Sequence, residues 1–231
     1  NQKLNTKDES SIENWKNLLE NINNQDNKEI TIAICGKYTK LEDSYASIIE
    51  ALNHCSAHLK ANIRLKWIET SDLKEIKNEL KNVKGIIVPG GFGSRGVEGK
   101  INVIKHAREN NIPFLGLCYG LQLAVIEYAR NICKLTSANS TEIDKETEVP
   151  IIDILEGHKE KLGKGKTMRL GRYKAILKEN SRVYEIYENS EVFERHRHHY
   201  EVNPKYHKIL EDNGLLLSGM SEDNVLVEYI E

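Results

Sequence analysis

Long apolar segments and a strong excess of either charge are both missing from this sequence. No apolar stretch approaches the roughly 20 residues that cross a bilayer, and the polar segment 1–11 excludes a secretory signal at that position. The formal net charge of -2 gives no reason to expect a nucleic acid or an anionic membrane as partner. With 39% hydrophobic and 29% charged residues, the 231-residue chain has the composition of a soluble protein with one large α/β domain or two small ones.

Cysteine is scarce, and its four occurrences are isolated from one another: Cys35, Cys55, Cys118 and Cys133. Because no Cys-x-x-Cys pair is present, the sequence argues against a zinc ribbon and against a dense disulfide framework. A reducing, cytoplasmic setting is the simplest interpretation.

Loops that bind nucleotide phosphates are also missing. Gly91-x-Gly93-x-x-Gly96 matches the dinucleotide fingerprint, but that fingerprint needs an acidic residue at the end of the next strand, where this chain has Cys118. Gly165-Lys166-Thr167 has Glu160 where a phosphate-binding P-loop needs glycine. The sequence therefore disfavours a hydride-transfer enzyme.

Alternation of short β-rich runs with helical patterns dominates the first two thirds of the chain. The predicted strands are 30–35, 63–68, 85–88 and 112–117, and the predicted helices are 43–52, capped by Asp43 or Ser44, then 72–80, 98–109 and 121–131. This order predicts an α/β fold with three layers, a mostly parallel central sheet and helices on both of its faces. After Ala138, β-like segments predict a smaller β-rich C-terminal part: 150–155, 173–177, 195–202, 215–218 and 225–230. The polar loop 156–166 is predicted to be mobile.

The first 28 residues are predicted to form an N-terminal amphipathic helix and a linker, and residues 29–231 the main domain. Ser10 or Ser11 is a suitable N-cap, and the helix would pack on the body through one apolar stripe. That stripe consists of Ile12, Trp15, Leu18, Leu19 and Ile22. A frayed tail with an accidental stripe is the alternative.

The segment 112–124 runs from an apolar strand directly into a helix, and its turn reads Gly116-x-Cys118-x-Gly120. This is the cysteine form of a nucleophile elbow, a sharp turn that lifts the nucleophile above the carboxyl edge of the sheet. Glycine flanks the nucleophile because the crowded turn leaves no room for a Cβ. Since the first N–H groups of the helix favour a thiolate and a developing oxyanion, we predict that Cys118 is a nucleophile, not a buried structural cysteine.

Two further segments are candidate parts of the same site. Segment 89–96 follows a buried strand, so its free backbone N–H groups are available as the other half of an oxyanion hole. In an extended segment 194–203, Arg195, Arg197 and His199 share one face, and His196, His198 and Tyr200 share the other. An arginine at this position is suited to hold a substrate carboxylate, and a basic surface strand is the alternative. A metal site at these histidines is disfavoured.

Beyond the elbow, several runs resemble the C-terminal class I glutamine amidotransferase domain of CTP synthases, and the match extends from about Lys28 to the end of the chain. These runs are Gly36-Lys37-Tyr38-Thr39, Asp43-Ser44-Tyr45, Pro89-Gly90-Gly91-Phe92-Gly93, Arg95-Gly96-Val97-Glu98-Gly99-Lys100, Ala138-Asn139-Ser140-Thr141-Glu142, Thr167-Met168-Arg169-Leu170-Gly171, Arg195-His196-Arg197-His198 and Tyr200-Glu201-Val202-Asn203. The elbow alone is typical of the whole superfamily, whereas the Thr-Met-Arg-Leu-Gly and Arg-His-Arg-His runs are specific to the CTP synthase branch.

The resemblance implies hydrolysis of L-glutamine to glutamate and ammonia through a glutamyl thioester on Cys118. It implies that the backbone N–H groups of Gly91 and Tyr119 hold the oxyanion. The implied glutamine-binding residues are Gly91, Tyr119, Gln122, Glu142 and Arg197, with Arg195 as the alternative to Arg197.

For the full enzyme, the resemblance implies a cytoplasmic ligase of pyrimidine nucleotide biosynthesis. Ammonia would pass to a synthetase domain of the same polypeptide, which aminates UTP to CTP with ATP and Mg²⁺. GTP would activate the enzyme, and a homo-oligomer, namely a tetramer, is expected. No cofactor or metal is expected in the amidotransferase domain, and neither nucleic acid nor membrane is expected as a partner.

Three features depart from the family pattern. Tyr119 and Leu121 stand where the family commonly has Leu and Met, and His199 stands where it has Arg. The family takes its general base from a late His-Pro-x-Glu segment, and no His-Pro occurs in residues 1–231. We therefore expect a domain that is truncated at its C-terminus, with the synthetase domain absent from this sequence. A catalytically incompetent regulatory or assembly domain is the main alternative, and another cysteine-elbow enzyme, such as a peptidase or isomerase, is a weaker one.

Overall fold

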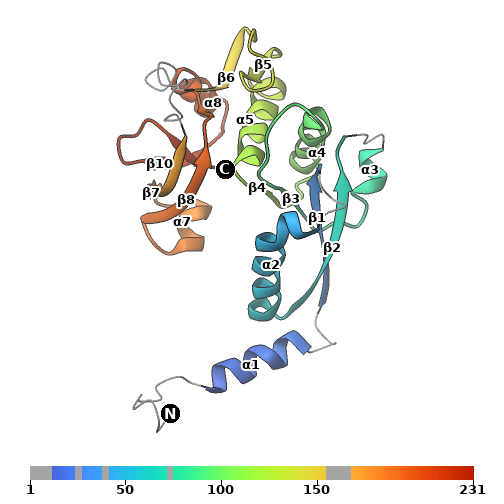
Figure 1. Ribbon diagram of the computed structural model, residues 1–231. Helices are drawn as coiled ribbons and strands as arrows, with labels where there is room; N and C mark the ends of the chain where they lie inside the picture. The colour runs from blue at the N-terminus through green and yellow to red at the C-terminus, as the bar shows by residue number, and fades with distance from the viewer. Residues whose placement is uncertain (1–11, 24–27, 38–41, 72–74, 155–167) are drawn as a thin grey trace.

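The computed structural model describes residues 12–23, 28–37, 42–71, 75–154 and 168–231 (Figure 1). The predicted caps Ser10 and Ser11 and the predicted mobile loop 156–166 lie outside these residues. None of the helices in the described ranges is both long and apolar enough to span a membrane.

A parallel sheet of four strands forms the first part of the protein. Its strands are β1 (Lys28–Gly36), β2 (Ala61–Glu69), β3 (Gly85–Val88) and β4 (Phe114–Gly116), in the order β2-β1-β3-β4. The helices between and after them are α2 (Ala46–Leu59), α3 (Ile76–Glu79), α4 (Val97–Glu109) and α5 (Tyr119–Asn131). The predicted alternation of strand and helix in this region is confirmed.

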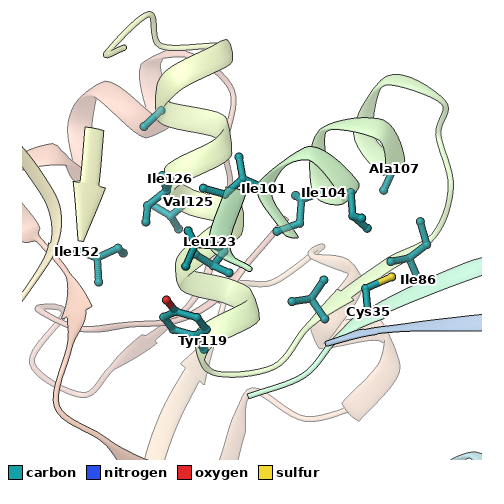
Figure 2. Close-up of a cluster of buried hydrophobic side chains, with 14 of the residues drawn as sticks. Cys35, Ile86, Ile101, Ile104, Ala107, Tyr119, Leu123, Val125, Ile126 and Ile152 are labelled. Carbon is teal, nitrogen blue, oxygen red and sulfur yellow. The ribbon is translucent and has the colours of Figure 1, made fainter. Parts of the chain in front are cut away.

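The two faces of this sheet are buried by different helices. Ala33 and Cys35 of β1 belong to the same core cluster as side chains of α4 and α5 such as Ile104 and Leu123. Figure 2 shows Cys35, Ile104 and Leu123 in this cluster. Ile34 alternates with Ala33 and Cys35 and therefore points to the opposite face, which α2 covers. On that side Tyr45 stacks on Trp67, with ring centroids 5.6 Å apart. The three predicted layers are thus confirmed.

The C-terminal part is β-rich, as predicted. An antiparallel sheet has the order β11-β10-β7-β8, and a smaller sheet has the order β5-β6-β9. The strands are β5 (Ala138–Ser140), β6 (Val149–Asp153), β7 (Arg169–Leu177), β8 (Glu191–His198), β9 (Glu201–Val202), β10 (Leu217–Ser221) and β11 (Val227–Ile230). Helix α5 contacts β5, β6 and β9 as well as β3 and β4, so it lies between the parallel sheet and the β-rich part (Figure 1).

Several local predictions need correction. Asp43 and Ser44 do not cap α2, because they lie in a 3₁₀ turn (Glu42–Tyr45) and the N-cap is Tyr45, which makes no capping hydrogen bond through its side chain. The predicted strand 195–202 is broken between β8 and β9, where the Tyr200 carbonyl bonds to side chains. The sequence analysis missed β5 and the short helices α7 (Arg182–Tyr187) and α8 (His207–Asp212).

The predicted N-terminal helix is present as α1 (Ile12–Asn23). It lies beside α2 at one end of the molecule (Figure 1). Trp15 and Leu19, which the stripe was expected to bury, are 66% and 56% exposed. Contact with α2 therefore leaves these two side chains largely exposed.

An ion pair between half-buried Arg108 and buried Glu127 joins α4 to α5. The Glu127 side chain is 1% exposed and accepts hydrogen bonds from Arg108 Nε and Nη2 at 3.0 and 2.8 Å. Asn131 Nδ2 donates to the same carboxylate at 3.0 Å. Because burial of a carboxylate is costly without such partners, this pair fixes the position of α5 against α4.

We predict that Arg108→Met lowers the free energy of unfolding by about 3 kcal/mol, because it leaves the Glu127 carboxylate buried without its cation. The matched control is Lys105→Met on the same helix, whose ion pair with Glu109 is exposed and 3.9 Å long; its effect should stay below about 0.5 kcal/mol. Equilibrium denaturation in urea measures both. Equal losses in the two variants would show that the buried pair has no special role.

Candidate active site

The chain passes from β4 into α5 through a strained residue, Cys118, with φ 53° and ψ −101°. A positive φ is uncommon for a residue with a Cβ and is typical of strained turns at functional sites. Leu117 N donates to the Val88 carbonyl at 3.0 Å, and Gly120 N donates to the Leu117 carbonyl at 2.9 Å. The predicted sharp strand-to-helix turn is therefore present.

Both glycines of the elbow are required by close backbone contacts. A Cβ added at Gly120 would lie 2.1 Å from the Val88 carbonyl oxygen, and one added at Gly116 would lie 2.7 Å from the Gly120 carbonyl carbon. Non-bonded atoms do not approach so closely, so any larger residue would push α5 away from β3. The elbow thus depends on the contact of α5 with the end of β3.

The Cys118 residue is exposed, in contrast to the buried Cys35 and Cys133. Desolvation nevertheless raises the pKa of its thiol, the backbone N–H of Tyr119 lowers this pKa by donating to the sulfur, and the charges of Glu201 and Glu142 raise it. The net direction is upward, so attack on a substrate requires a proton acceptor.

The loop after β3 lies over the elbow. A Cβ at Gly90 would lie 3.8 Å from Cys118 Cβ, and one at Gly91 would lie 3.6 Å from Tyr119 Cδ1. The Tyr119 hydroxyl donates to the Gly93 carbonyl at 2.6 Å and so fastens the loop to α5. Gly91 and Tyr119 are therefore neighbours, as an oxyanion hole built from both requires. That they hold the oxyanion stays a prediction.

Two of the predicted glutamine-binding residues lie at this site. Glu142 follows β5, and its carboxylate accepts a hydrogen bond from Gly93 N at 2.8 Å. Gln122 is 6% exposed, and its Nε2 donates to the Tyr200 carbonyl at 2.8 Å. The side-chain nitrogen of Gln122 is thus bound to the protein, and contact of either residue with glutamine stays a prediction.

The predicted arginines lie on another element, β8. Arg195 and Arg197 are exposed and pair with Arg172 and Leu170 of β7 across the ladder. Their alternation with His196 and His198 is confirmed. Within the described ranges, no hydrogen bond or ion pair joins either arginine to the elbow, so the role of Arg197 in binding glutamine stays a prediction.

A buried charge cluster that the sequence analysis missed lies beside the elbow. Arg169 pairs with Glu201 at 3.2 Å and with Glu228 at 2.7 Å, and all three side chains are buried. Burial raises the pKa of Glu201 to about 7. Arg169 and Glu201 lie in runs that carry the family resemblance, which was the only signal in the sequence that could have found them.

Comparisons with known proteins identify the family of this chain. The family model for class-I glutamine amidotransferases matches residues 40–231. The chain belongs to the class-I glutamine amidotransferase family. Within this family its likeness is to the CTP synthases, as the sequence predicted.

The similar curated proteins include the CTP synthase of Methanocaldococcus jannaschii, 51% identical over 100% of this chain and 44% of the relative. The CTP synthase of Sulfolobus acidocaldarius is 53% identical over 96% of this chain and 42% of the relative. The chain thus spans less than half the length of these relatives. A similar solved structure is the Trypanosoma brucei CTPS glutaminase domain with bound acivicin, with a TM-score of 0.81, 34% identity, and coverage of 87% of this chain and 80% of that chain.

We predict that Gly120→Ala destabilises the protein by about 2–3 kcal/mol or more, because its Cβ would collide with the Val88 carbonyl oxygen. Gly90→Ala is the matched control, since its Cβ would meet Cys118 Cβ at 3.8 Å, an ordinary contact distance; its cost should stay below about 1 kcal/mol. Urea denaturation compares the two variants. A tolerated alanine at position 120 would contradict the tight elbow.

Proposed function

We propose that this domain hydrolyses L-glutamine and supplies ammonia, with Cys118 as the nucleophile. The observation that carries the proposal is the strained, exposed Cys118 at the start of α5, beside the glycine loop. This geometry suits attack on a carboxamide, because the sulfur and the backbone N–H groups of α5 face the same space.

In this mechanism a general base takes the proton of the Cys118 thiol as the sulfur bonds to the amide carbon of glutamine, and the carbonyl oxygen becomes an oxyanion. The backbone N–H groups of Gly91 and Tyr119 stabilise that oxyanion. Collapse of the tetrahedral intermediate breaks the C–N bond and releases ammonia, which takes up the proton of the thiol. Water then hydrolyses the glutamyl thioester to glutamate and restores the thiol.

Charged groups of the substrate require partners around this centre. Glu142 is suited to the α-ammonium group of glutamine, because its carboxylate is held at the loop by Gly93 N. Arg197, or Arg195 on the same face of β8, is suited to the α-carboxylate. Gln122 supports the pocket through the Tyr200 carbonyl and retains its Oε1 as an acceptor.

The proposed destination of the ammonia follows from the likeness to CTP synthases. A synthetase domain of the same polypeptide would aminate UTP, and ATP, Mg²⁺ and the activator GTP would serve that full enzyme, as a homo-oligomer. The steps proposed for this domain involve none of these groups. Comparison with the relatives supports this context, since they carry the CTP synthase name over more than twice the length of this chain.

We predict that, in the natural full-length polypeptide, Cys118→Ser lowers ammonia release from glutamine by at least about a thousandfold. The control is Cys55→Ser, which changes the other exposed cysteine, on α2, and should keep full activity. The glutamine mimic diazo-oxo-norleucine should label Cys118 alone, as read by peptide mass spectrometry. Acivicin, which is bound in the trypanosomal glutaminase domain, is a second probe.

Two outcomes would contradict this proposal. Labelling spread over all four cysteines would argue against a single activated thiol. A folded natural polypeptide that releases no ammonia would favour a catalytically incompetent regulatory or assembly domain.

A further inference from the structure

Five side chains form a closed network in the β-rich part, which we name the charge ring: Arg169, His196, His198, Glu201 and Glu228. Arg169 on β7 bridges Glu201 on β9 and Glu228 on β11 at 3.2 and 2.7 Å. The two carboxylates are 6% and 3% exposed. His196 and His198 on β8 complete the ring, at 3.6 Å from Glu228 and 3.5 Å from Glu201 respectively. Their own ring nitrogens lie 3.0 Å apart.

Hydrogen bonds tie the two histidines of the charge ring to each other and to the backbone. Tyr200 O lies 3.0 Å from His198 Nδ1, so a neutral His198 carries its proton there and accepts at Nε2. His196 Nδ1 must then donate to His198 Nε2 at 3.0 Å. His196 Nε2 lies 3.6 Å from the Glu228 carboxylate, beyond hydrogen-bond distance, so this contact is electrostatic.

Burial also makes the net charge of the ring costly. Two carboxylates and one guanidinium carry a net charge of minus one when the histidines are neutral, and a buried net charge is costly. Burial lowers the pKa of His198 to about 4 and raises that of Glu201 to about 7. Burial thus favours a proton on Glu201 over one on His198.

A single carbonyl connects the charge ring to the nucleophile elbow. Tyr200 O accepts hydrogen bonds from His198 Nδ1 at 3.0 Å and from Gln122 Nε2 at 2.8 Å. Gln122 lies in the first turn of α5, where its backbone N donates to Cys118 O at 3.1 Å. A continuous series of hydrogen bonds thus connects the buried charge ring to Cys118, the predicted nucleophile.

The charge ring also anchors the strand that carries the predicted substrate arginine. His196 and His198 lie on the ring side of β8, so Arg195 and Arg197 point to the opposite face. Movement of the two histidines would shift Arg197 and Tyr200 together. The ring is therefore placed to control where a glutamine carboxylate lies relative to Cys118.

We propose that the charge ring is a positioning device for the glutaminase reaction, which holds β8 and the Tyr200 carbonyl in place against the elbow. This inference rests on the proposed function. The residues of the ring act through Tyr200, Gln122 and Arg197, and none of them is assigned a contact with the substrate.

The first test separates positioning from folding at His198, in the natural full-length polypeptide. His198→Leu removes the hydrogen bond to Tyr200 O and should raise KM for glutamine by about tenfold or more, with kcat within about threefold. His198→Asn retains an N–H donor near the Nδ1 position and should restore KM to within about threefold. His106→Leu is the control, since that ring contacts Asn110 on α4.

A KM for His198→Leu equal to that of the unaltered protein would overturn the proposal. If His198→Leu does not fold, the proposal would also be overturned by a His198→Asn protein that folds but still has a raised KM for glutamine. If His198→Leu and His198→Asn both unfold in thermal melts, the ring is a stability element, and the positioning proposal fails in that case too.

The second test uses the charge that the ring places near the nucleophile. Charged or titratable groups around Glu201 within the described ranges are Arg169, Glu228, His198 and Cys118, together with Asp153, its ladder partner on β6. Negative charge on Glu201 raises the pKa of the Cys118 thiol. Glu201→Gln should therefore move the pH midpoint of Cys118 alkylation by iodoacetamide downward, by roughly 0.5 pH unit. An unchanged or higher midpoint would contradict the coupling.

The alkylation measurement needs no glutamine turnover, so it separates the two hypotheses. If the unaltered protein releases no ammonia but Glu201→Gln lowers the alkylation midpoint, the proposed function fails and the coupling of the ring to Cys118 stands. If ammonia is released and neither KM nor the midpoint responds to the ring variants, the function stands and the positioning proposal fails.

Discussion

The close packing of α5 on the end of β3 is the constraint on which the rest of the site depends. Gly120 lies so near the Val88 carbonyl that there is no room for a Cβ, and Cys118, two residues earlier in the same turn, has a positive φ. In this conformation residue Cys118 is exposed while the neighbouring Tyr119 is buried. Strain at one residue is maintained by a surrounding core that leaves the helix no other position.

Buried charges fix the elements around this turn in place. The Glu127–Arg108 pair sets α5 against α4, and Arg169 with its two carboxylates ties together three strands of the β-rich part. Such groups are costly to bury and tolerate few arrangements, since each must keep its hydrogen-bond partners. If the proposed function is correct, they fix the position of the nucleophile beside one sheet relative to substrate-binding groups on another.

The parts of the structure that local patterns determine were predictable from the sequence. Gly85–Val88 was predicted to the residue, and Gly116-x-Cys118-x-Gly120 identified the elbow, because apolar runs and flanking glycines act over a few residues. The contacts of Arg169 with Glu201 and Glu228 were missed because these residues lie far apart in the chain and no local spacing pattern predicts their contact. The break between β8 and β9 was missed for the same reason. The Tyr200 carbonyl at this break accepts a hydrogen bond from Gln122, which lies far away in the sequence on α5.

The account is tested most directly by a structure of the natural polypeptide after reaction with diazo-oxo-norleucine. We predict an adduct on Cys118 whose ketone oxygen lies within about 3 Å of the backbone nitrogens of both Gly91 and Tyr119. An adduct oxygen that points into solvent or towards other groups would contradict the central claim that this elbow and glycine loop form one oxyanion site.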